Sequence, residues 1–203
     1  MQGLLEKGFY STELDEKIFA RIDDLSYKKD CPLPLSELRY LHVLHKDLSG
    51  KTLEGELICN AKITEPLTDI FRKLFTENYP IEKIRLIDEY EADDELSMSD
   101  NNSSCFNFRY VSFTKRISLH GYGLAVDINP LYNPYIKEVD GKKIIAPETA
   151  VDFEDRTKDF PYKITADDLC CRLFAEHGFK WGGRDLPDEL DYQHFFIEEG
   201  IVR

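Results

Sequence analysis

The chain has no surplus of positive charge: 26 Lys and Arg residues stand against 39 Asp and Glu residues, for a formal net charge of −13. A protein of this charge repels nucleic acids and anionic membrane surfaces, because both are polyanions. The sequence also lacks a Lys/Arg-rich arm that could bind either of them. We therefore expect no nucleic acid partner.

Long apolar runs are also missing. No window approaches the ~18 consecutive apolar residues of a membrane helix, so we expect no membrane insertion. The first thirty residues lack the apolar core and the cleavage site of a signal peptide. If the protein works outside the cytoplasm, either a leader was removed from this chain or export depends on a lysis partner.

The sequence also lacks a complete set of cysteine pairs, because its five cysteines are an odd number. None has zinc-ligand spacing with a histidine, which argues against a Cys-rich structural zinc site. Cys170 and Cys171 are neighbours on a predicted helix and therefore point in different directions. We expect mostly free, buried thiols.

What is present is enough apolar sequence for one core. A chain of 203 residues with 42% hydrophobic content supports a single sizeable domain, and no repeat or low-complexity linker divides it. We predict an N-terminal extension at 1–35, a single domain at 36–203, and a monomer. The acidic run at 88–95 is typical of a solvated loop and does not indicate a calcium site.

Hydrophobic periodicity and turn residues predict short helices and strands in mixed order. We expect helices at 14–24, at 64–75 with Thr64 as N-cap, and from a capping box at 165–168 to Gly178. We expect strands at 39–44, 81–87, 124–128 and 195–197, and a hairpin of 135–139 and 143–145 that turns at Asp140-Gly141. This order predicts an α+β fold with a small, mainly antiparallel sheet and helices packed around it.

Two segments carry chemistry. The first runs from Ser118 to Asp127 and contains His120, and the second runs from Asp191 to His194. Two imidazoles and two carboxylates are the parts of a hydrolytic zinc site, in which three N/O ligands leave one position open. His120, Asp127 and His194 would fill that set, and Asp191 would remain as a base.

The spacing of the first segment requires a break in the strand. Side chains seven positions apart on a plain strand point to opposite faces, so His120 and Asp127 converge only if the chain kinks between them. Gly121 and Gly123 lie where such a kink is needed. We place Asp191 on the turn that enters the last strand and His194 at its start.

Three ordered motifs resemble those of one enzyme family. They are S-x-H-x-x-G-x-A-x-D at 118–127, Trp-Gly-Gly at 181–183 and D-x-x-H-F at 191–195, preceded by an arginine-bearing stretch at 98–109. Over positions ~40–203 the chain resembles the M15 family of zinc D,D-carboxypeptidases and D,D-dipeptidases, which includes L-alanyl-D-glutamate endopeptidases. The resemblance implies a D,D-peptidase/hedgehog-like fold with the zinc site at the sheet.

The resemblance also implies roles for individual residues. It assigns Zn²⁺ to His120, Asp127 and His194, and the general base to Asp191. It gives Arg109 the stabilisation of an oxyanion or the binding of a substrate carboxylate. We expect the substrate to contact four residues, namely Ser118, Asn107, Trp181 and Tyr132.

Several of these residues also have a purely structural interpretation. Trp181 fits a buried core anchor as well as a cleft wall, and Tyr132 fits a rigid turn as well as a substrate wall. Arg109 could form an ordinary ion pair in so acidic a chain. The other histidines, His42, His45 and His177, have no acidic partner at a telling spacing, and we expect hydrogen-bonded structural roles for them.

The resemblance implies zinc-dependent hydrolysis of an amide bond in peptidoglycan stem peptides, of the D,D-carboxypeptidase or L-alanyl-D-glutamate endopeptidase type. Such an enzyme works at the cell wall, in the periplasm or after secretion, although the cytoplasm stays open. Two alternatives remain. One is a non-catalytic, zinc-containing cell-wall-binding protein. The other is a metal-independent glycosidase with Asp127 and Asp191 as its carboxylate pair.

Overall fold

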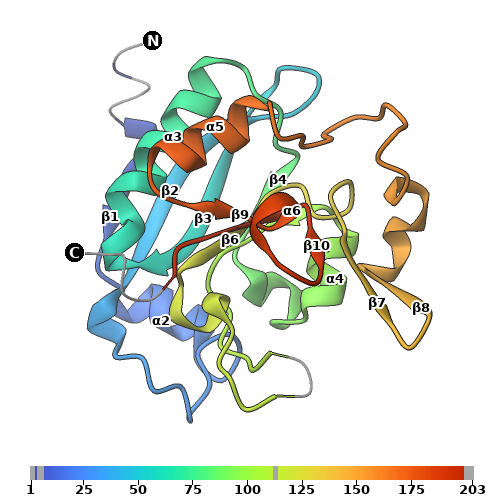
Figure 1. Cartoon of the computed structure of the whole chain (residues 1–203). Helices are drawn as coiled ribbons and strands as arrows, with labels where there is room; N and C mark the ends of the chain where they lie inside the picture. Colours follow the sequence, from blue (N-terminus) through green and yellow to red (C-terminus); the bar gives the residue numbers. More distant parts are fainter. Residues whose placement is uncertain (1–2, 4–6, 112–113, 199–203) are drawn as a thin grey trace.

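The computed structural model describes residues 3, 7–111 and 114–198. The α-helices are α2 (Glu16–Ile22), α3 (Thr64–Thr76), α4 (Asp94–Ser99), α5 (Leu169–Glu176) and α6 (Gly182–Asp185). The strands are β1 (Tyr10–Thr12), β2 (Leu38–Lys46), β3 (Thr52–Asn60), β4 (Lys83–Ile84), β5 (Asn102–Ser103), β6 (Ala125–Asp127), β7 (Tyr135–Val139), β8 (Lys142–Ala146), β9 (Lys180–Trp181), β10 (Leu190–Asp191) and β11 (His194–Phe196). The fold is α+β, as predicted, but its strands form several small sheets (Figure 1).

The first sheet has the order β1-β2-β3 and is antiparallel throughout. The helix α3 packs on β2, and α5 lies beside α3 in the upper part of the molecule (Figure 1). The strand expected at 39–44 is confirmed within β2. Its long partner β3 was not predicted, because Glu54 and Glu56 interrupt the apolar residues of that strand.

One apolar cluster joins this sheet to the strands that carry the site. It includes Leu41 of β2, Phe71 of α3, Val126 of β6 and Phe195 of β11, and all four are almost fully buried. The ring of Phe174 in α5 stacks on Phe195 with centroids 4.2 Å apart. The site strands therefore rest on a close-packed interior that resists displacement.

The helix predicted at 64–75 begins at Thr64 as expected, but its predicted N-cap and the predicted start of the 165–178 helix are wrong. Thr64 is not the N-cap of α3, because a 3₁₀ turn at Ala61–Ile63 precedes it and Asn60 caps that turn by accepting from Lys62 N at 3.1 Å. The helix α5 begins after Asp168, whose side chain accepts from Cys170 N at 2.7 Å, so the expected capping box at 165–168 is not its start. The predicted end of this helix agrees better with the structure, because Gly178, in the left-handed conformation with φ +83°, follows α5.

The region 81–99 differs most from expectation. The strand predicted at 81–87 is shortened to β4, Lys83–Ile84. It ends there because the N–H of Arg85 donates to the side chain of Asn102 and not to a backbone carbonyl of a neighbouring strand. The strand β4 pairs in parallel with β5. The acidic run at 88–95 is not a solvated loop: it forms a 3₁₀ helix at Ile87–Tyr90 and the start of α4, and Asp88 accepts from Ser26 N at 2.9 Å.

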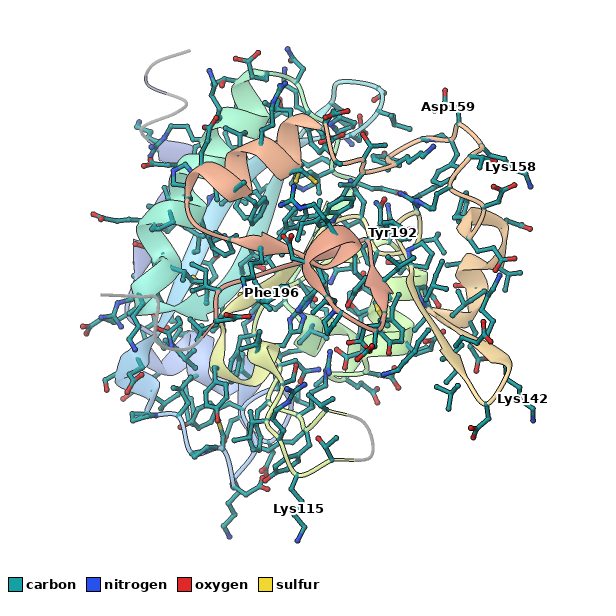
Figure 2. The ribbon with its side chains drawn as sticks, viewed as in Figure 1. Lys115, Lys142, Lys158, Asp159, Tyr192 and Phe196 are labelled. Atoms are coloured by element: carbon teal, nitrogen blue, oxygen red, sulfur yellow. The ribbon has the colours of Figure 1, made fainter. Side chains whose placement is uncertain are left out.

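Two further sheets surround the site. One has the order β6-β11-β9, and the other, β10-β7-β8, contains the predicted hairpin with its left-handed turn at Asp140-Gly141. The hairpin lies at the lower right of Figure 1, and Figure 2 shows Lys142 at its tip. Where one small sheet was predicted, the described residues form three antiparallel sheets and one parallel pair.

Other expectations concern the whole chain. All five cysteines are free, and four of them are buried, as predicted. No helix in the described part of the chain is long and apolar enough to cross a membrane. The strand β1, from the proposed N-terminal extension, pairs with β2, and the boundary at residue 35 stays a prediction.

Candidate metal centre

His120 lies on a 3₁₀ helix, Leu119–Tyr122, that replaces the expected strand kink. Ser118 caps this helix, and its Oγ accepts from His120 N at 3.3 Å. The helix ends at Gly123, with φ +64°, and a Cβ there would lie 2.7 Å from Asn60 N. Glycine is therefore required at 123 both by backbone conformation and by close contact.

Gly121 is required for a different reason. Its φ is not in the left-handed region, but a Cβ at this position would lie 2.6 Å from Cγ2 of Ile117 and 3.4 Å from the carbonyl oxygen of Arg109. The glycine lets the His120 turn pack against the extended stretch that carries Arg109. The two glycines thus produce a turn with close backbone packing, where the spacing alone indicated only a kink.

Asp127 and His194 are brought together by the β ladder. Asp127 ends β6, His194 begins β11, and the two are direct antiparallel partners. Directly paired residues point to the same face of a sheet, so their side chains meet. Asp127 also exchanges two backbone hydrogen bonds with Ser104, which fixes the end of β6 on its other side.

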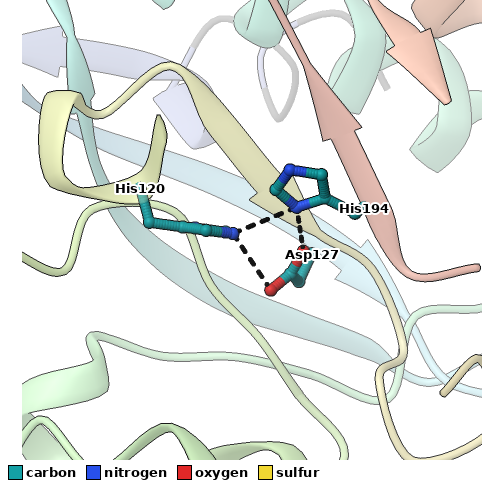
Figure 3. Close-up of side chains that lie close together, drawn as sticks. All are labelled: His120, Asp127 and His194. Atoms are coloured by element: carbon teal, nitrogen blue, oxygen red, sulfur yellow. Dashed lines mark hydrogen bonds and ion pairs between the residues drawn. The ribbon is translucent and has the colours of Figure 1, made fainter. Parts of the chain in front are cut away.

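The three side chains converge on one point (Figure 3). His120 Nε2 lies 3.1 Å from His194 Nδ1 and 3.2 Å from Asp127 Oδ2, and His194 Nδ1 lies 2.9 Å from Asp127 Oδ1. Four ligands at the usual zinc distance of about 2.0–2.1 Å form a tetrahedron with edges of about 3.3 Å. The three separations are close to that edge, with the two histidines facing different oxygens of the Asp127 carboxylate, so the set is compact enough to hold a zinc ion.

The protonation states also suit a cation. The Nδ1 of His120 donates to the carbonyl oxygen of Cys105 at 2.6 Å, so Nε2, which faces Asp127 and His194, is the ring nitrogen left to bind a metal. Burial alone would raise the pKa of Asp127, but the two imidazoles hold that pKa well below its usual range. Burial lowers the pKa of His120, but the charge of Asp127 and the hydrogen bond to it together outweigh burial, so the pKa of His120 shows a net rise.

Asp191 lies beside this set but is not one of its members. It is the last residue of β10 and pairs with Tyr135, so it belongs to a different sheet from His194. The predicted position of Asp191 on a turn is therefore wrong, because the residue lies in a short strand. Burial is the main reason that the pKa of Asp191 is raised to about 7, and the charge of Asp127 adds to the rise. Its Oδ1 is buried and has no hydrogen-bond partner among the described residues.

The Trp-Gly-Gly motif packs beneath the turn from Asp191 to His194. A Cβ at Gly182 would lie 2.6 Å from the carbonyl oxygen of Asp191, and one at Gly183 would lie 2.3 Å from the Trp181 ring. The indole Nε1 donates to the carbonyl oxygen of Tyr192 at 2.9 Å, and Trp181 is 6% exposed. Trp181 is therefore a core anchor that holds the site turn, and Figure 2 shows Tyr192 near the middle of the molecule.

Arg109 and Asn107 run alongside the His120 turn. Asn107 N donates to His120 O at 3.1 Å, and Ser118 N donates to Arg109 O at 2.9 Å. The Arg109 guanidinium forms an ion pair with Asp94. The amide nitrogen of Asn107 donates to Ala92 O and Asp94 Oδ1, so only its Oδ1 is left for a ligand.

The remaining predicted residues lie in more ordinary surroundings. The ring of Tyr132 packs on those of Phe153 and Tyr162, with centroids 4.5 and 5.2 Å away. The other three histidines bind backbone carbonyls through Nδ1, as expected for structural histidines: His42 to Gly8, His45 to Ile81 and His177 to Leu173. Two contributors to the site were not predicted, namely Cys105, which acts through its carbonyl, and Asp94.

A family model described as D-alanyl-D-alanine carboxypeptidase matches residues 112–197. This segment is therefore similar to the M15 peptidase family. The M15 match contains the three-ligand set, Asp191 and the Trp-Gly-Gly motif, whereas Asp94, Asn107 and Arg109 precede it. Neither the curated proteins nor the solved structures gave a match to the chain.

Proposed function

We propose that the protein is a zinc-dependent peptidase that cleaves an amide bond next to a D-residue in peptidoglycan stem peptides. The M15 match supports a peptidase that acts on peptidoglycan. The observation that carries the finer proposal is the meeting of His120, Asp127 and His194, which come from one 3₁₀ turn and two paired strands. A set of two histidines and one carboxylate is the ligand type of a hydrolytic zinc site with one open position.

Zinc would be held by His120 Nε2, His194 Nδ1 and the Asp127 carboxylate. When bound, zinc supplies Lewis acidity to the carbonyl oxygen of the substrate and to the attacking water. The most exposed of the three side chains is His194, at 14% against 11% for Asp127 and 5% for His120. We therefore infer that the substrate approaches from the His194 side.

Asp191 is suited to the role of general base. It is buried next to the ligand set, its Oδ1 has no partner among the described residues, and its pKa of about 7 matches a proton acceptor at neutral pH. We infer that it takes a proton from the attacking water and passes it to the leaving amine. Arg109 would stabilise the negative charge that develops on the carbonyl oxygen, or bind a substrate carboxylate.

The proposal leaves two cleavage types, the D,D-carboxypeptidase and the L-alanyl-D-glutamate endopeptidase, with peptidoglycan peptides as partners of a monomeric enzyme. It places the activity where peptidoglycan is found, at the cell wall, in the periplasm or after secretion. A zinc-containing wall-binding protein without activity would need neither Asp191 nor Arg109, and both are present beside the site.

The test is incubation of purified peptidoglycan with the protein, with and without chelator, followed by mass spectrometry of the fragments. We expect chelator-sensitive release of D-alanine or of fragments cut between L-alanine and D-glutamate. Glycan cleavage that survives chelation would indicate the glycosidase instead. Peptidoglycan that stays intact, with one zinc bound per chain, would indicate the wall-binding protein.

A further inference from the structure

The ion pair between Arg109 and Asp94 joins two parts of the chain that the family match does not cover. Asp94 Oδ2 approaches the Nε of Arg109, and this is the acidic partner of that guanidinium among the described residues. The Arg109 side chain remains 33% exposed. Because the carboxylate contacts Nε, this ion pair does not occupy the two terminal nitrogens, which stay available as donors to a substrate.

Asp94 is itself held in place from several directions. Asp93 caps α4 by accepting from Leu96 N at 3.0 Å, which fixes the first turn in which Asp94 lies. Asn107 donates to Asp94 Oδ1 at 3.0 Å and to Ala92 O at 3.2 Å. Both partners of this amide nitrogen are acceptors, so the orientation of the Asn107 amide is fixed.

The same stretch of chain is tied to a metal ligand. Asn107 N donates to the carbonyl oxygen of His120. Burial and Asp127 have the largest effects on the pKa of His120; beyond these, the charge of Arg109 lowers that pKa and the charge of Asp94 raises it. The carboxylate of Asp94, the guanidinium of Arg109 and the His120 turn therefore form one connected unit beside the ligand set.

We propose that Asp94 is a positioning residue that holds the Arg109 guanidinium beside the His120 turn of the metal site. This proposal rests on the proposed function for its effect on catalysis, but the placement of Arg109 is independent of it. An arginine side chain has several rotatable bonds, and without a fixed partner it samples many orientations. An ion pair this exposed adds little stability, so its contribution lies in orientation.

The matched pair of variants is Asp94→Asn and Asp93→Asn. Each removes one negative charge from the start of α4. Asparagine is as good an N-cap as aspartate, so Asp93→Asn keeps the helix start and leaves Arg109 untouched. In Asp94→Asn the new amide is neutral and has a single oxygen, so it cannot both accept from Asn107 and form an ion pair with Arg109, as the two carboxylate oxygens do.

The first measurement needs no activity. We expect the Arg109 Nε–H resonance, identified by its loss in Arg109→Lys, to show a heteronuclear NOE close to that of the rigid backbone. In Asp94→Asn the NOE should fall to the value of a free side chain, and in Asp93→Asn it should stay high. An equally high NOE in Asp94→Asn would overturn the proposal. If this pattern holds but the wild type cleaves no peptidoglycan peptide, the proposed function fails and the placement of Arg109 stands.

The second measurement is a double-mutant cycle on kcat/KM with zinc content checked in each variant. We expect Asp94→Asn to lose about tenfold or more, because small displacements of a positioned group have large effects. In an Arg109→Lys background the same change should lose less than about twofold, since the group that Asp94 positions is already gone. Equal losses in both backgrounds would show that Asp94 does not act through Arg109.

Discussion

The proposed metal ligands and the Arg109 unit, namely Asp94, Asn107 and Arg109, are positioned at the same site by different means. Asp127 and His194 are adjacent because β6 and β11 pair directly, and their backbone positions are fixed by ladder hydrogen bonds. Arg109 is placed by a side-chain ion pair to Asp94, and both side chains are about one-third exposed. The first region is positioned by the main chain, and the second by charges that solvent can screen.

This difference predicts how each region responds to substitution. Removing a ligand side chain should leave the strands in place and abolish metal binding. Removing a partner in the Arg109 unit should leave metal binding and the fold intact, and should only make the orientation of the Arg109 guanidinium less fixed. Substitutions at the site should thus separate into changes in metal content and changes in rate.

The largest effect should come from His120→Ala. We expect one zinc per chain in the wild type, none in the variant, and hydrolysis reduced by at least about 10⁴-fold, because the site loses its Lewis acid. The thermal midpoint should also fall, since the binding energy of a preformed metal site is part of the folding energy. Elemental analysis of protein purified without added metal checks this prediction. His45→Ala, which removes a buried structural histidine, is the control and should keep its zinc.

The next largest effect separates the two carboxylates. Asp191→Asn should keep zinc while kcat falls by roughly 10²–10⁴, the usual contribution of a general base. Asp127→Asn replaces an anionic ligand by a weak neutral one and should lose zinc. Zinc content and rate are measured on both variants. If Asp191→Asn loses its metal while Asp127→Asn retains it, the two roles are reversed.

The three candidate ligands could be predicted because the motifs that contain them lie within short segments of the sequence. His-x₆-Asp and Asp-x₂-His lie within short segments, and glycines mark the turn between the first two ligands. The long-range pairing of β6 with β11 was not predicted, because the family resemblance implied only that the zinc site lies at the sheet. The 3₁₀ form of the His120 turn was not predicted either, because a strand kink and a turn have the same residue signal.

The Arg109 unit could be predicted only in part. The arginine itself was found by resemblance, but Asp94 lies 15 positions upstream in an acidic run that is typical of solvated surface. Nothing in its residue type separates it from Asp93, which caps the helix. The carbonyl of Cys105 leaves no sequence signal at all, because every residue has a carbonyl group.

Arg109→Lys should have the next effect in size. Lysine keeps the charge but not the planar fork, so we expect a loss in kcat of about 10² with zinc content unchanged. Arg72→Lys is the control, because Arg72 pairs with Asp69 on the surface of α3 and has no role in the proposed reaction. Near-normal turnover in Arg109→Lys would reduce Arg109 to a surface ion pair.

The smallest effect concerns the stability of the metal-free protein, and it follows from the raised pKa of Asp191. Between pH 4 and 7 the folded state holds a proton on Asp191 that the unfolded state has released, because burial raises the pKa from 3.8 to about 7. Its contribution to stability is therefore complete below pH 4 and is lost as the pH rises to about 7. Asp191→Asn should remove this loss and raise the free energy of unfolding at pH 8 by a few kcal/mol.

Asp185 provides a control of opposite sign for this measurement. Its pKa is lowered, first by the hydrogen bond from Arg184, so its carboxylate stabilises the folded state above the unfolded pKa of 3.8. Asp185→Asn should therefore lower stability at pH 8, where Asp191→Asn raises it. Denaturant unfolding in chelator at pH 4 and pH 8 measures both variants. If Asp191→Asn lowers stability at pH 8, then its carboxylate is not a destabilising buried charge, and the explanation of its suitability as a base is wrong.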